Sequence, residues 1–240
     1  MAVSLRGPDS PRDNRLLAGL PIEEYDSLLP HLEHVGFPLG QLVHAADERL
    51  ASVYFPTTCV VSTLFTSMEG ATAEIGLTGR DGAVGIALFL GGNVMPGRAV
   101  VQIAGEGFGI KDKILRQQFA RGGAFQRRLL LYTQAYITQI SQTAVCNRLH
   151  SLEKRLARWL LLCHDRVSSN ELLMTQEFIA GMLGGRRESV TVAAGHLQDV
   201  RVIHYARGRI KIIDRDGLQA AACECYRIVK EEDDRLFGKQ

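Results

Sequence analysis

The sequence predicts an α+β protein in which a β-rich part and a helical part are joined by a long helix. Between Val35 and Lys111, short apolar runs are separated by glycine and proline, as is typical of a β-sandwich or β-roll. Residues 124–148 contain neither proline nor glycine and predict the long helix. Residues 173–214 have the spacing of two short helices followed by a hairpin. A length of 240 residues leaves room for two modest domains.

The composition is that of a globular protein, with 46% hydrophobic and 22% charged residues. No apolar run approaches the ~20 residues that a membrane helix needs. The polar N-terminal segment MAVSLRGPDSPRDNR lacks the apolar region of a secretion signal. We therefore expect a cytoplasmic protein without a membrane partner. The cysteines are scattered and odd in number, which fits a reducing compartment; they are Cys59, Cys146, Cys163, Cys223 and Cys225.

The N-terminal part is expected to begin with a disordered tail over residues 1–14, which are polar and include proline. Leucines at helix-like spacing between residues 15 and 32 predict one or two short helices, because prolines interrupt the pattern. In the β-rich part, Met68-Glu69-Gly70 is a hairpin-turn signal. The expected strands are Gln41–His44, Ser52–Phe55, Cys59–Ser67, Thr72–Leu77, Gly82–Leu88 and Arg98–Ile103.

The helical part is expected to begin with a short helix over Asp112–Ala120, broken at Gly122-Gly123. One face of the long helix that follows carries a stripe of residues close to heptad spacing. We expect this stripe to pair with its copy in a second subunit; the alternative is a helix buried only within its own chain. The predicted interface residues are Leu130, Thr133, Ile137, Ile140 and Ala144.

The stretch from Leu173 to Asp214 predicts a winged helix-turn-helix, a device that places one helix in the major groove of DNA. Thr175 is placed to cap a first helix, glycine at 184–185 to end it, and a second helix begins near Arg186. The hairpin that follows has the sequence YARGR at its tip. The alternative is an ordinary helical hairpin in a core. A window of twenty residues has polar, small, glycine and apolar residues at its first, fifth, ninth and fifteenth places, namely Gln176, Ala180, Gly184 and Val190.

Charge is distributed unevenly along the chain. Residues 1–118 hold 9 Lys and Arg against 13 Asp and Glu, whereas residues 119–240 hold 19 against 13. A basic half with a helix-turn-helix fits a polyanionic partner, because neutralising phosphates supplies most non-specific DNA affinity. Double-stranded DNA is the expected partner.

Two stretches carry a resemblance to a known family, TQEFIAGMLGGRRESV and GRDGAVGIALFLGGNVMPGRAVVQIAG. With the order of β-roll, long helix and winged helix-turn-helix, they resemble the Crp/Fnr superfamily of bacterial transcription regulators, over roughly residues 15–215. The resemblance implies a homodimer on a pseudo-palindromic operator, with RNA polymerase as a candidate partner. It divides the chain into a tail (1–14), a cyclic-nucleotide-binding-like β-roll sensor (15–122), a dimerisation helix (123–149), a winged helix-turn-helix domain (150–230) and a charged tail (231–240).

The resemblance also implies which side chains contact DNA. Arg187 and Glu188 match the family's base-reading pair, since arginine pairs with guanine and glutamate accepts from cytosine. The chain departs from the family at Val192, where a second arginine is common, and at Arg186, where a capping serine or threonine is common. We therefore expect a different operator. Arg207 and Arg209 at the wing tip are either phosphate contacts or solvated turn charges. The predicted DNA-binding residues are Thr175, Gln176, Arg186, Arg187, Glu188, Ser189, Arg207 and Arg209.

The expected sensor lacks part of the family's nucleotide-binding pattern. Relatives that bind cyclic nucleotides use a Gly-Glu pair for the ribose and an Arg-Ser/Thr-Ala run for the phosphate. Here Ala83 follows Gly82, so the charged hydrogen bond of the glutamate is missing. We expect no cAMP binding. The alternative is a cyclic nucleotide or another small ligand in a pocket near Arg98, with Gly82, Gly85, Arg98 and Ala99 as candidate ligand-binding residues.

Neither a metal nor a cofactor is expected. The cysteine cluster of iron-sulfur relatives is missing near the N-terminus, and Cys223-x-Cys225 is interpreted as helix packing. These cysteines belong to an expected helix over Leu218–Lys230, packed on the winged domain. The sequence contains no Gly-x-Ser-x-Gly, P-loop or HExxH motif, so an enzyme is not expected. A protein-interaction module that has lost DNA binding stays open, and salt-sensitive DNA binding distinguishes the two.

Overall fold

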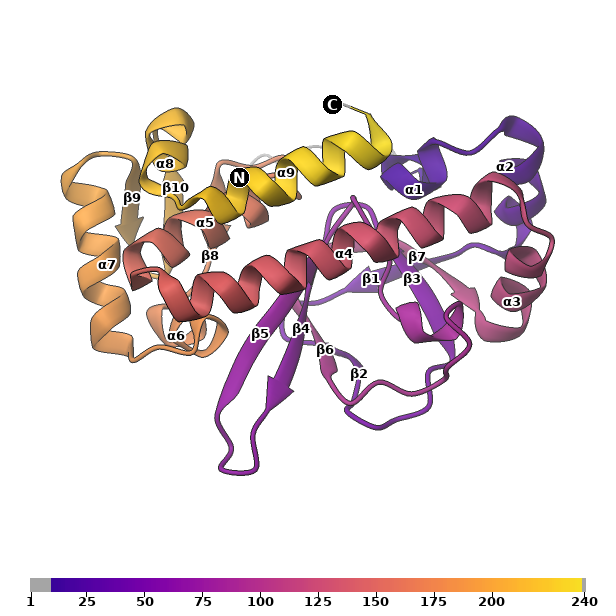
Figure 1. The fold of residues 1–240 in the computed structure, drawn as a ribbon, viewed down its shortest axis with the longest axis horizontal. Helices are drawn as coiled ribbons and strands as arrows, with labels where there is room; N and C mark the ends of the chain where they lie inside the picture. The colour runs from indigo at the N-terminus through magenta and orange to yellow at the C-terminus, as the bar shows by residue number, and fades with distance from the viewer. Residues whose placement is uncertain (1–9, 239–240) are drawn as a thin grey trace.

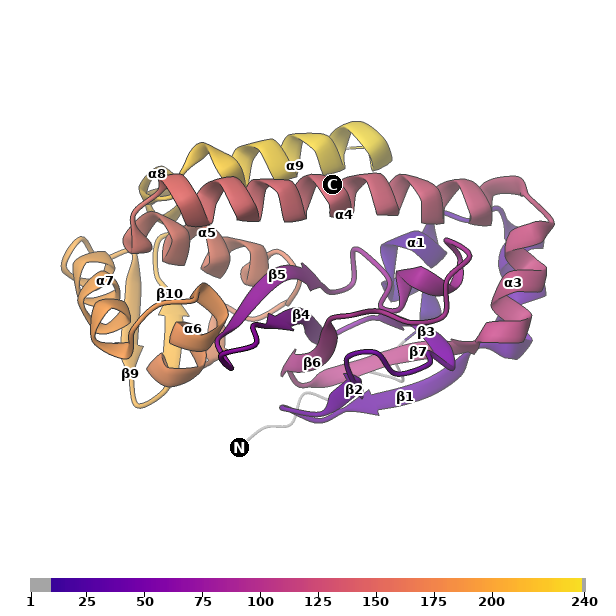
Figure 2. The ribbon, with the colours of Figure 1, turned by 60° about the horizontal axis from the view of Figure 1, so that its bottom comes forward.

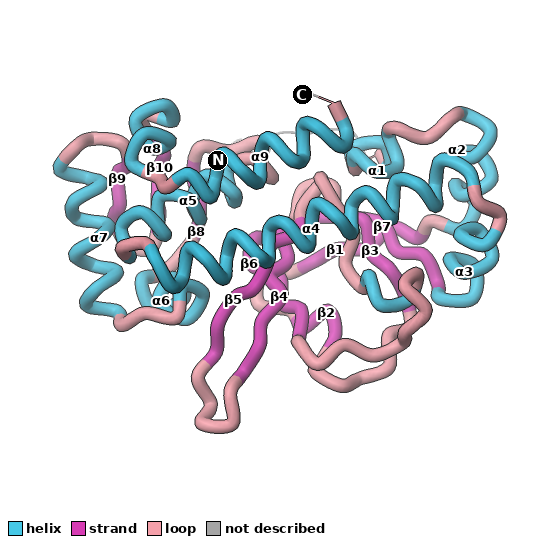
Figure 3. Tube along the Cα trace, viewed as in Figure 1, coloured by secondary structure: helices cyan, strands magenta, loops and turns pink. Residues whose placement is uncertain are grey.

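The computed structural model describes residues 10–238. The β-roll lies beneath the long helix α4 (Gly123–Leu149), and the helix-rich domain lies at the C-terminal end of α4 (Figure 1, Figure 2). The C-terminal helix α9 (Glu224–Phe237) runs beside α4 (Figure 1, Figure 2). Figure 3 shows most strands gathered beneath α4, with a second small group of strands in the helix-rich domain. Within residues 10–238, no helix combines the length and apolar character needed to span a membrane.

The N-terminal segment corrects the expectation of a disordered tail. Residues 1–9 of that tail lie outside the described residues, but Pro11–Asp13 forms the 3-10 helix η1. Asn14 is fully buried, and its side chain donates to the carbonyl oxygens of Pro56 at 2.8 Å and Gly82 at 2.9 Å. These bonds fix the start of the domain to two loops of the β-roll. The short helices that follow were predicted; they are α1 (Arg15–Ala18), α2 (Ile22–Leu28) and η2 (Leu29–His31).

The β-roll consists of two antiparallel sheets. One has the order β1-β7-β3 and the other β2-β6-β4-β5. One core of the β-roll includes Phe37, Val61 and Val101. Phe55 of β3 belongs to a second core that reaches the helices at Leu115 and Phe125. The strands are β1 (Glu33–Phe37), β2 (Leu42–His44), β3 (Ser52–Pro56), β4 (Val60–Thr66), β5 (Thr72–Thr78), β6 (Arg98–Ile103) and β7 (Gly105–Lys111).

The strand expected over Gly82–Leu88 is wrong. Gly85 has a φ of 97°, which ends the extended chain, and the 3-10 helix η3 (Ile86–Leu88) follows. Strand β7, by contrast, was not predicted, because three of its residues are glycines. A Cβ at Gly107 would lie 2.8 Å from the carbonyl oxygen of Phe55, so glycine is what allows β7 to approach β3.

The helices α3 (Asp112–Ala120) and α4 confirm the predicted helices between residues 112 and 148. Gly122 and Gly123, with φ values of 78° and 81°, make the turn between them. One face of α4 covers the β-roll, where Gln139 accepts from the backbone N–H of Leu77 at 2.7 Å and donates to its carbonyl at 3.1 Å. The amide thus satisfies a backbone edge of β5.

The helix-rich domain begins after α4 with α5 (Leu152–His164). It contains the three-stranded sheet β8-β10-β9 and a core around Trp159, Ile179 and Leu197. Its further elements are β8 (Glu171–Leu173), α6 (Gln176–Leu183), α7 (Arg187–Asp199), β9 (Ile203–Ala206) and β10 (Arg209–Ile212).

The C-terminal segment corrects two expectations. Instead of one helix over residues 218–230, the chain forms α8 (Arg215–Ala221) and α9, and the expected charged tail from residue 231 is helical to Phe237. Residues 239–240 lie outside the described part. Rather than packing only on the winged domain, α9 lies along α4 and reaches α1 of the N-terminal domain (Figure 1). There Asp233 forms an ion pair with Arg15. Its charged residues sustain the helix through pairs such as Arg227–Glu231 at 3.1 Å.

Candidate DNA-binding surface and its link to the β-roll

The helix-turn-helix is formed by α6, a glycine turn and α7, as the spacing predicted. The hydroxyl of Thr175 accepts from the backbone N–H of Phe178 at 3.2 Å and caps α6. Gly184, with a φ of 59°, ends α6 in the left-handed conformation. Ala180 and Val190 are buried between the helices, where a larger side chain at 180 would push them apart.

The N-terminal end of α7 presents four of the predicted DNA-binding side chains to solvent. They are Arg186, Arg187, Glu188 and Ser189. Behind them, the hydroxyl oxygen of Thr191 lies 2.8 Å from the side-chain amide of Gln176 and 3.0 Å from the carbonyl oxygen of Arg187. The hydroxyl of Thr191 thereby couples the start of α6 to the first turn of α7, so both helices present one rigid face.

The wing is the β9–β10 hairpin, whose two-residue turn is Arg207-Gly208. Their φ values of 51° and 74° are both positive, as a type I′ turn requires. Arg207 is exposed at the tip. Arg209 forms an ion pair with Glu171 of β8 at 2.6 Å, so a phosphate would compete with this carboxylate. A groove runs between the wing and the helices, lined by Thr175, Gln176, Glu177, Arg187, Tyr205, Ala206, Arg207 and Gly208.

Sequence reasoning did not single out Tyr205 or Thr191. Tyr205 is half-buried in the groove and donates its hydroxyl to the carbonyl oxygen of Met174 at 3.1 Å. Burial raises the pKa of Tyr205, and the positive charge of Arg187 opposes that shift. The alternation of exposed His204, half-buried Tyr205 and exposed Ala206 along β9 is the signal that could have identified it.

The predicted ligand-binding residues are not gathered at one point. Gly82 packs against the ring of Tyr132, which a Cβ at this position would overlap. Gly85 instead lines a cavity of about 90 Å³ together with His44 and Tyr54. Ala99 is buried within β6, and Arg98 is exposed at the start of that strand, opposite Leu64 of β4.

Two tyrosines of α4 fill the contact between α4 and the β-roll. The rings of Tyr132 and Tyr136 stack with centroids 5.8 Å apart. The hydroxyl of Tyr132 lies 3.0 Å from that of Thr78, and Tyr136 donates to Thr63 at 2.8 Å. Burial raises the pKa of Tyr136 to about 12, so its hydroxyl stays protonated and can donate at neutral pH.

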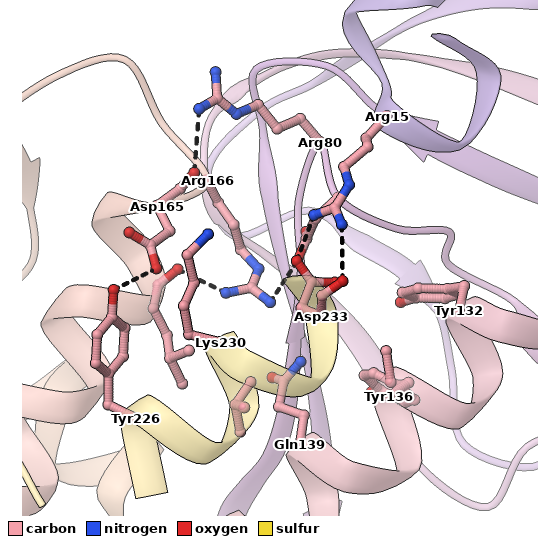
Figure 4. Close-up of a pocket in the computed structure, with 14 residues that line it drawn as sticks. Arg15, Arg80, Tyr132, Tyr136, Gln139, Asp165, Arg166, Tyr226, Lys230 and Asp233 are labelled. Atoms are coloured by element: carbon pink, nitrogen blue, oxygen red, sulfur yellow. Dashed lines mark hydrogen bonds and ion pairs between the residues drawn. The ribbon is translucent and has the colours of Figure 1, made fainter. Parts of the chain in front are cut away.

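A small charged cavity lies where the β-roll, α4, α5 and α9 meet (Figure 4). Its volume is about 50 Å³. The buried Arg166 forms an ion pair with Asp81 of the β-roll at 2.6 Å, and Arg80 donates to the carbonyl oxygen of Asp165 at 3.3 Å. In Figure 4 the charged side chains point toward one another and cross-link the parts of the chain. The charged residues around this cavity therefore connect the β-roll to the helix-rich domain through an ion pair and a hydrogen bond.

The predicted dimer-interface residues divide into two groups. Leu130 and Ile137 keep 46% and 58% of their surface exposed, and Ala144 is also exposed. Ile140 is half-buried, and Thr133 is buried with its hydroxyl donating to the carbonyl oxygen of Leu129 at 3.0 Å. The exposed members, Leu130, Ile137 and Ala144, are each seven residues apart and define a stripe that we call the α4 stripe.

The structure joins a β-roll through the long helix α4 to a winged helix-turn-helix domain. Residues 154–221 match the family model described as the Crp-like helix-turn-helix domain, so the chain carries this DNA-binding domain. No curated protein sequence matches the chain. The matched region includes the helix-turn-helix of α6 and α7 and the wing formed by β9 and β10.

Solved structures support the same fold over most of the chain. FixK2 from Bradyrhizobium japonicum is similar with a TM-score of 0.69 and 16% identity, over 80% of this chain and 98% of that one. A putative regulator of the Crp/Fnr family from Eubacterium rectale gives 0.66 and 18%, over 86% and 96%. The c-di-GMP-responsive regulator CLP from Xanthomonas campestris gives 0.63 and 15%, over 80% and 99%. The chain therefore has the Crp/Fnr regulator fold.

Proposed function

We propose that this protein is a transcription regulator of the Crp/Fnr type that binds a pseudo-palindromic operator as a homodimer. The observation that carries the proposal is the placement of Arg187 and Glu188 at the exposed N-terminal end of α7, beside Arg207 at the wing tip. In this geometry α7 enters the major groove and the wing lies on the backbone. Arg187 then donates to guanine, Glu188 accepts from the amino group of cytosine, and Arg207 neutralises a phosphate.

The operator preference differs from that of relatives with a second arginine on the recognition helix. Val192 occupies that position and keeps 56% of its surface exposed. An apolar side chain at this point in the groove favours the methyl group of thymine over a guanine edge. Ser189 and Thr175 supply further phosphate contacts. The wing residue Arg209 joins them only when phosphate displaces Glu171.

The homodimer is supported by the α4 stripe. Its side chains are exposed on the flank of α4 that neither the β-roll nor α9 covers, and a copy of the same helix buries them as a short coiled-coil seam. The isologous pairing places the two α7 helices for two half-sites, about one turn of DNA apart or a multiple of it.

The effector of this regulator is not cAMP. Two observations support this part of the proposal: Ala83 supplies no carboxylate for a ribose, and the ring of Tyr132 lies directly on Gly82. The exposed Arg98 stands apart from that contact, at the first residue of β6, an inner strand of its sheet.

The experiment that tests the proposal measures binding to a genomic fragment library at two salt concentrations, followed by sequencing of the retained fragments. We expect a palindromic motif and an affinity that falls steeply with salt, because phosphate contacts release counterions. Retention of no common motif, or binding that ignores salt, would contradict DNA binding as the function. It would favour a protein-interaction module.

A further inference from the structure

Four potential metal ligands meet at the end of α4 next to the DNA-binding domain. Cys146 lies in the last turn of α4 and His150 directly follows that helix. Cys223 is the N-cap of α9 and Cys225 lies in its first turn. One ligand atom of each side chain lies within 4.8 Å of all the others. All three cysteines are buried and reduced.

Two of the distances between ligand atoms are close to those of a tetrahedral site, and all of them are within 4.8 Å. The Sγ atoms of Cys146 and Cys223 are 3.4 Å apart, and Cys225 Sγ is 3.6 Å from His150 Nδ1. Around a zinc ion with Zn–S of ~2.3 Å and Zn–N of ~2.0 Å, ligand atoms are about 3.5 to 3.8 Å apart. The four side chains therefore lie close enough together for small shifts to bring them around one such ion.

The histidine is oriented as a ligand by a carboxylate. His150 Nε2 lies 3.2 Å from Glu224 Oε1, on the side of the ring that faces away from the cysteines. With its proton on Nε2, the neutral ring directs the lone pair of Nδ1 into the cluster. A carboxylate behind a metal-bound histidine is the usual outer partner at zinc sites, where it fixes the tautomer and strengthens the ligand.

A buried cation accompanies the cluster. Arg158 keeps only 4% of its surface exposed, its Nε has no hydrogen-bond partner, and within residues 10–238 it forms no ion pair with a carboxylate. Burial raises the pKa of Cys225 to about 11, and the charge of Arg158 opposes this shift. Three thiolates around a divalent ion leave a net charge of −1, which this guanidinium compensates.

The two remaining cysteines serve as an internal contrast. Cys59 lies in the β-roll, and burial raises its pKa to about 12. Cys163 is buried within α5, and burial raises its pKa as well. Cys146, Cys223 and Cys225, by contrast, form one group with His150 in which the ligand atoms all lie within 4.8 Å of one another.

We propose that Cys146, His150, Cys223 and Cys225 bind one thiophilic divalent metal ion, Zn²⁺, in a Cys₃His site. The site fastens the first turn of α9 to the last turn of α4, at the joint from which the DNA-binding domain departs. It replaces our expectation from sequence that Cys223-x-Cys225 serves helix packing alone. Cys146 lies 77 residues before Cys223, so only the folded chain brings the second pair of ligands to the first.

The test uses the full chain, purified under reducing conditions, freed of metal by chelation and titrated with Co²⁺. We expect one Co²⁺ per chain, with the intense visible absorption of a tetrahedral thiolate complex, and displacement by one equivalent of Zn²⁺. Cys225→Ser should lose the thiolate spectrum. Cys59→Ala, which removes a buried cysteine outside the cluster, should keep the spectrum and the stoichiometry.

A second variant keeps the test decisive where a cysteine substitution disturbs folding. Glu224 is exposed, so Glu224→Gln should leave the fold intact, as circular dichroism checks. It should weaken Zn²⁺ affinity roughly 10- to 100-fold, because it removes the outer carboxylate. Failure of the reduced wild-type chain to bind Co²⁺, an unchanged spectrum in Cys225→Ser, or unchanged affinity in Glu224→Gln would overturn the proposal. So would a Cys146–Cys223 disulfide in protein isolated under thiol-trapping conditions.

Discussion

Trp159 of α5 donates its indole N–H to the carboxyl group of Glu74 in β5, with 2.8 Å between Trp159 Nε1 and Glu74 Oε1. The bond joins the DNA-binding domain to the β-roll, and both side chains are buried. Burial raises the pKa of Glu74 to about 7. Ser62 lies 2.7 Å from Glu74 Oε2 and also contacts Gln102 Oε1. A single hydroxyl proton cannot serve both oxygens, so a protonated Glu74 that donates to Ser62 satisfies the whole chain of bonds.

This carboxyl group should make stability depend on pH. Because its folded-state pKa lies above the value of 4.5 for a free side chain, the folded state holds the proton more tightly than the unfolded state. The contribution of Glu74 to the free energy of unfolding is therefore fully present below pH 4.5. This contribution falls by up to about 3 kcal/mol as pH rises through 7. Urea unfolding of the wild type and of Glu74→Gln at pH 5 and pH 8 checks this. The variant should gain stability relative to the wild type at the higher pH; an equal pH response in both proteins would refute the assignment.

Arg187→Ala should weaken operator binding by about 1–3 kcal/mol and relax base preference at one position of each half-site, since it removes a bidentate contact to guanine. Fluorescence anisotropy with operator and random DNA measures both effects. Arg227→Ala is the matched control, because Arg227 is exposed on α9, away from the groove. Equal losses on operator and random DNA would reduce Arg187 to a phosphate contact.

Ile137→Asp should convert dimers into monomers, because it buries two carboxylates at the centre of the proposed seam. Sedimentation velocity measures the change. Ile22→Asp makes the same substitution at an exposed position on α2 and should leave dimers intact. Dimers that persist in Ile137→Asp would place the interface away from the α4 stripe.

Calorimetric titration with cAMP should give no binding heat at micromolar concentrations. The ribose finds no carboxylate beside Gly82, and the ring of Tyr132 lies on this glycine. Micromolar binding would show that Tyr132 moves aside and that Arg98 or another cation holds the phosphate.

The sequence predicted those features that depend on residues close together in the chain, and it did not predict those that depend on contacts between distant segments. Thr175, Gly184 and Val190 specify the helix-turn-helix through their spacing alone, and the structure places them as a cap, a left-handed turn and a buried plug. Strand β7 was not predicted, because its glycines are typical of turns in a sequence. Gly107 is needed where the backbone of β7 approaches the carbonyl oxygen of Phe55, and this contact forms only in the tertiary structure. Likewise, the partnership of Cys146 with Cys223 cannot be deduced from cysteine spacing.

The path of α9 was the largest departure. The sequence predicted a helix that ends at Lys230 and a charged tail beyond it, yet Asp233 pairs with Arg15 and the guanidinium of Arg128 lies 5.3 Å from the ring centroid of Phe237. Alternating charges on a helix do not distinguish a free end from one that docks along a neighbour. The apolar residues Tyr226, Val229 and Phe237 supplied a weak indication of the docked face.

Helices α4 and α9 are antiparallel and are in contact near both ends, through the cysteine–histidine cluster at one and through Arg128 of α4 against Phe237 of α9 at the other (Figure 1). Two helices joined in this way cannot pivot about one flexible point. A reorientation of the DNA-binding domain would have to slide α9 lengthwise past α4, in the manner of a shear movement rather than a hinge. A signal arising in the β-roll would then reach α7 as a small displacement along the helix axis. The size of this displacement would be limited by the weaker of the two contacts between α4 and α9.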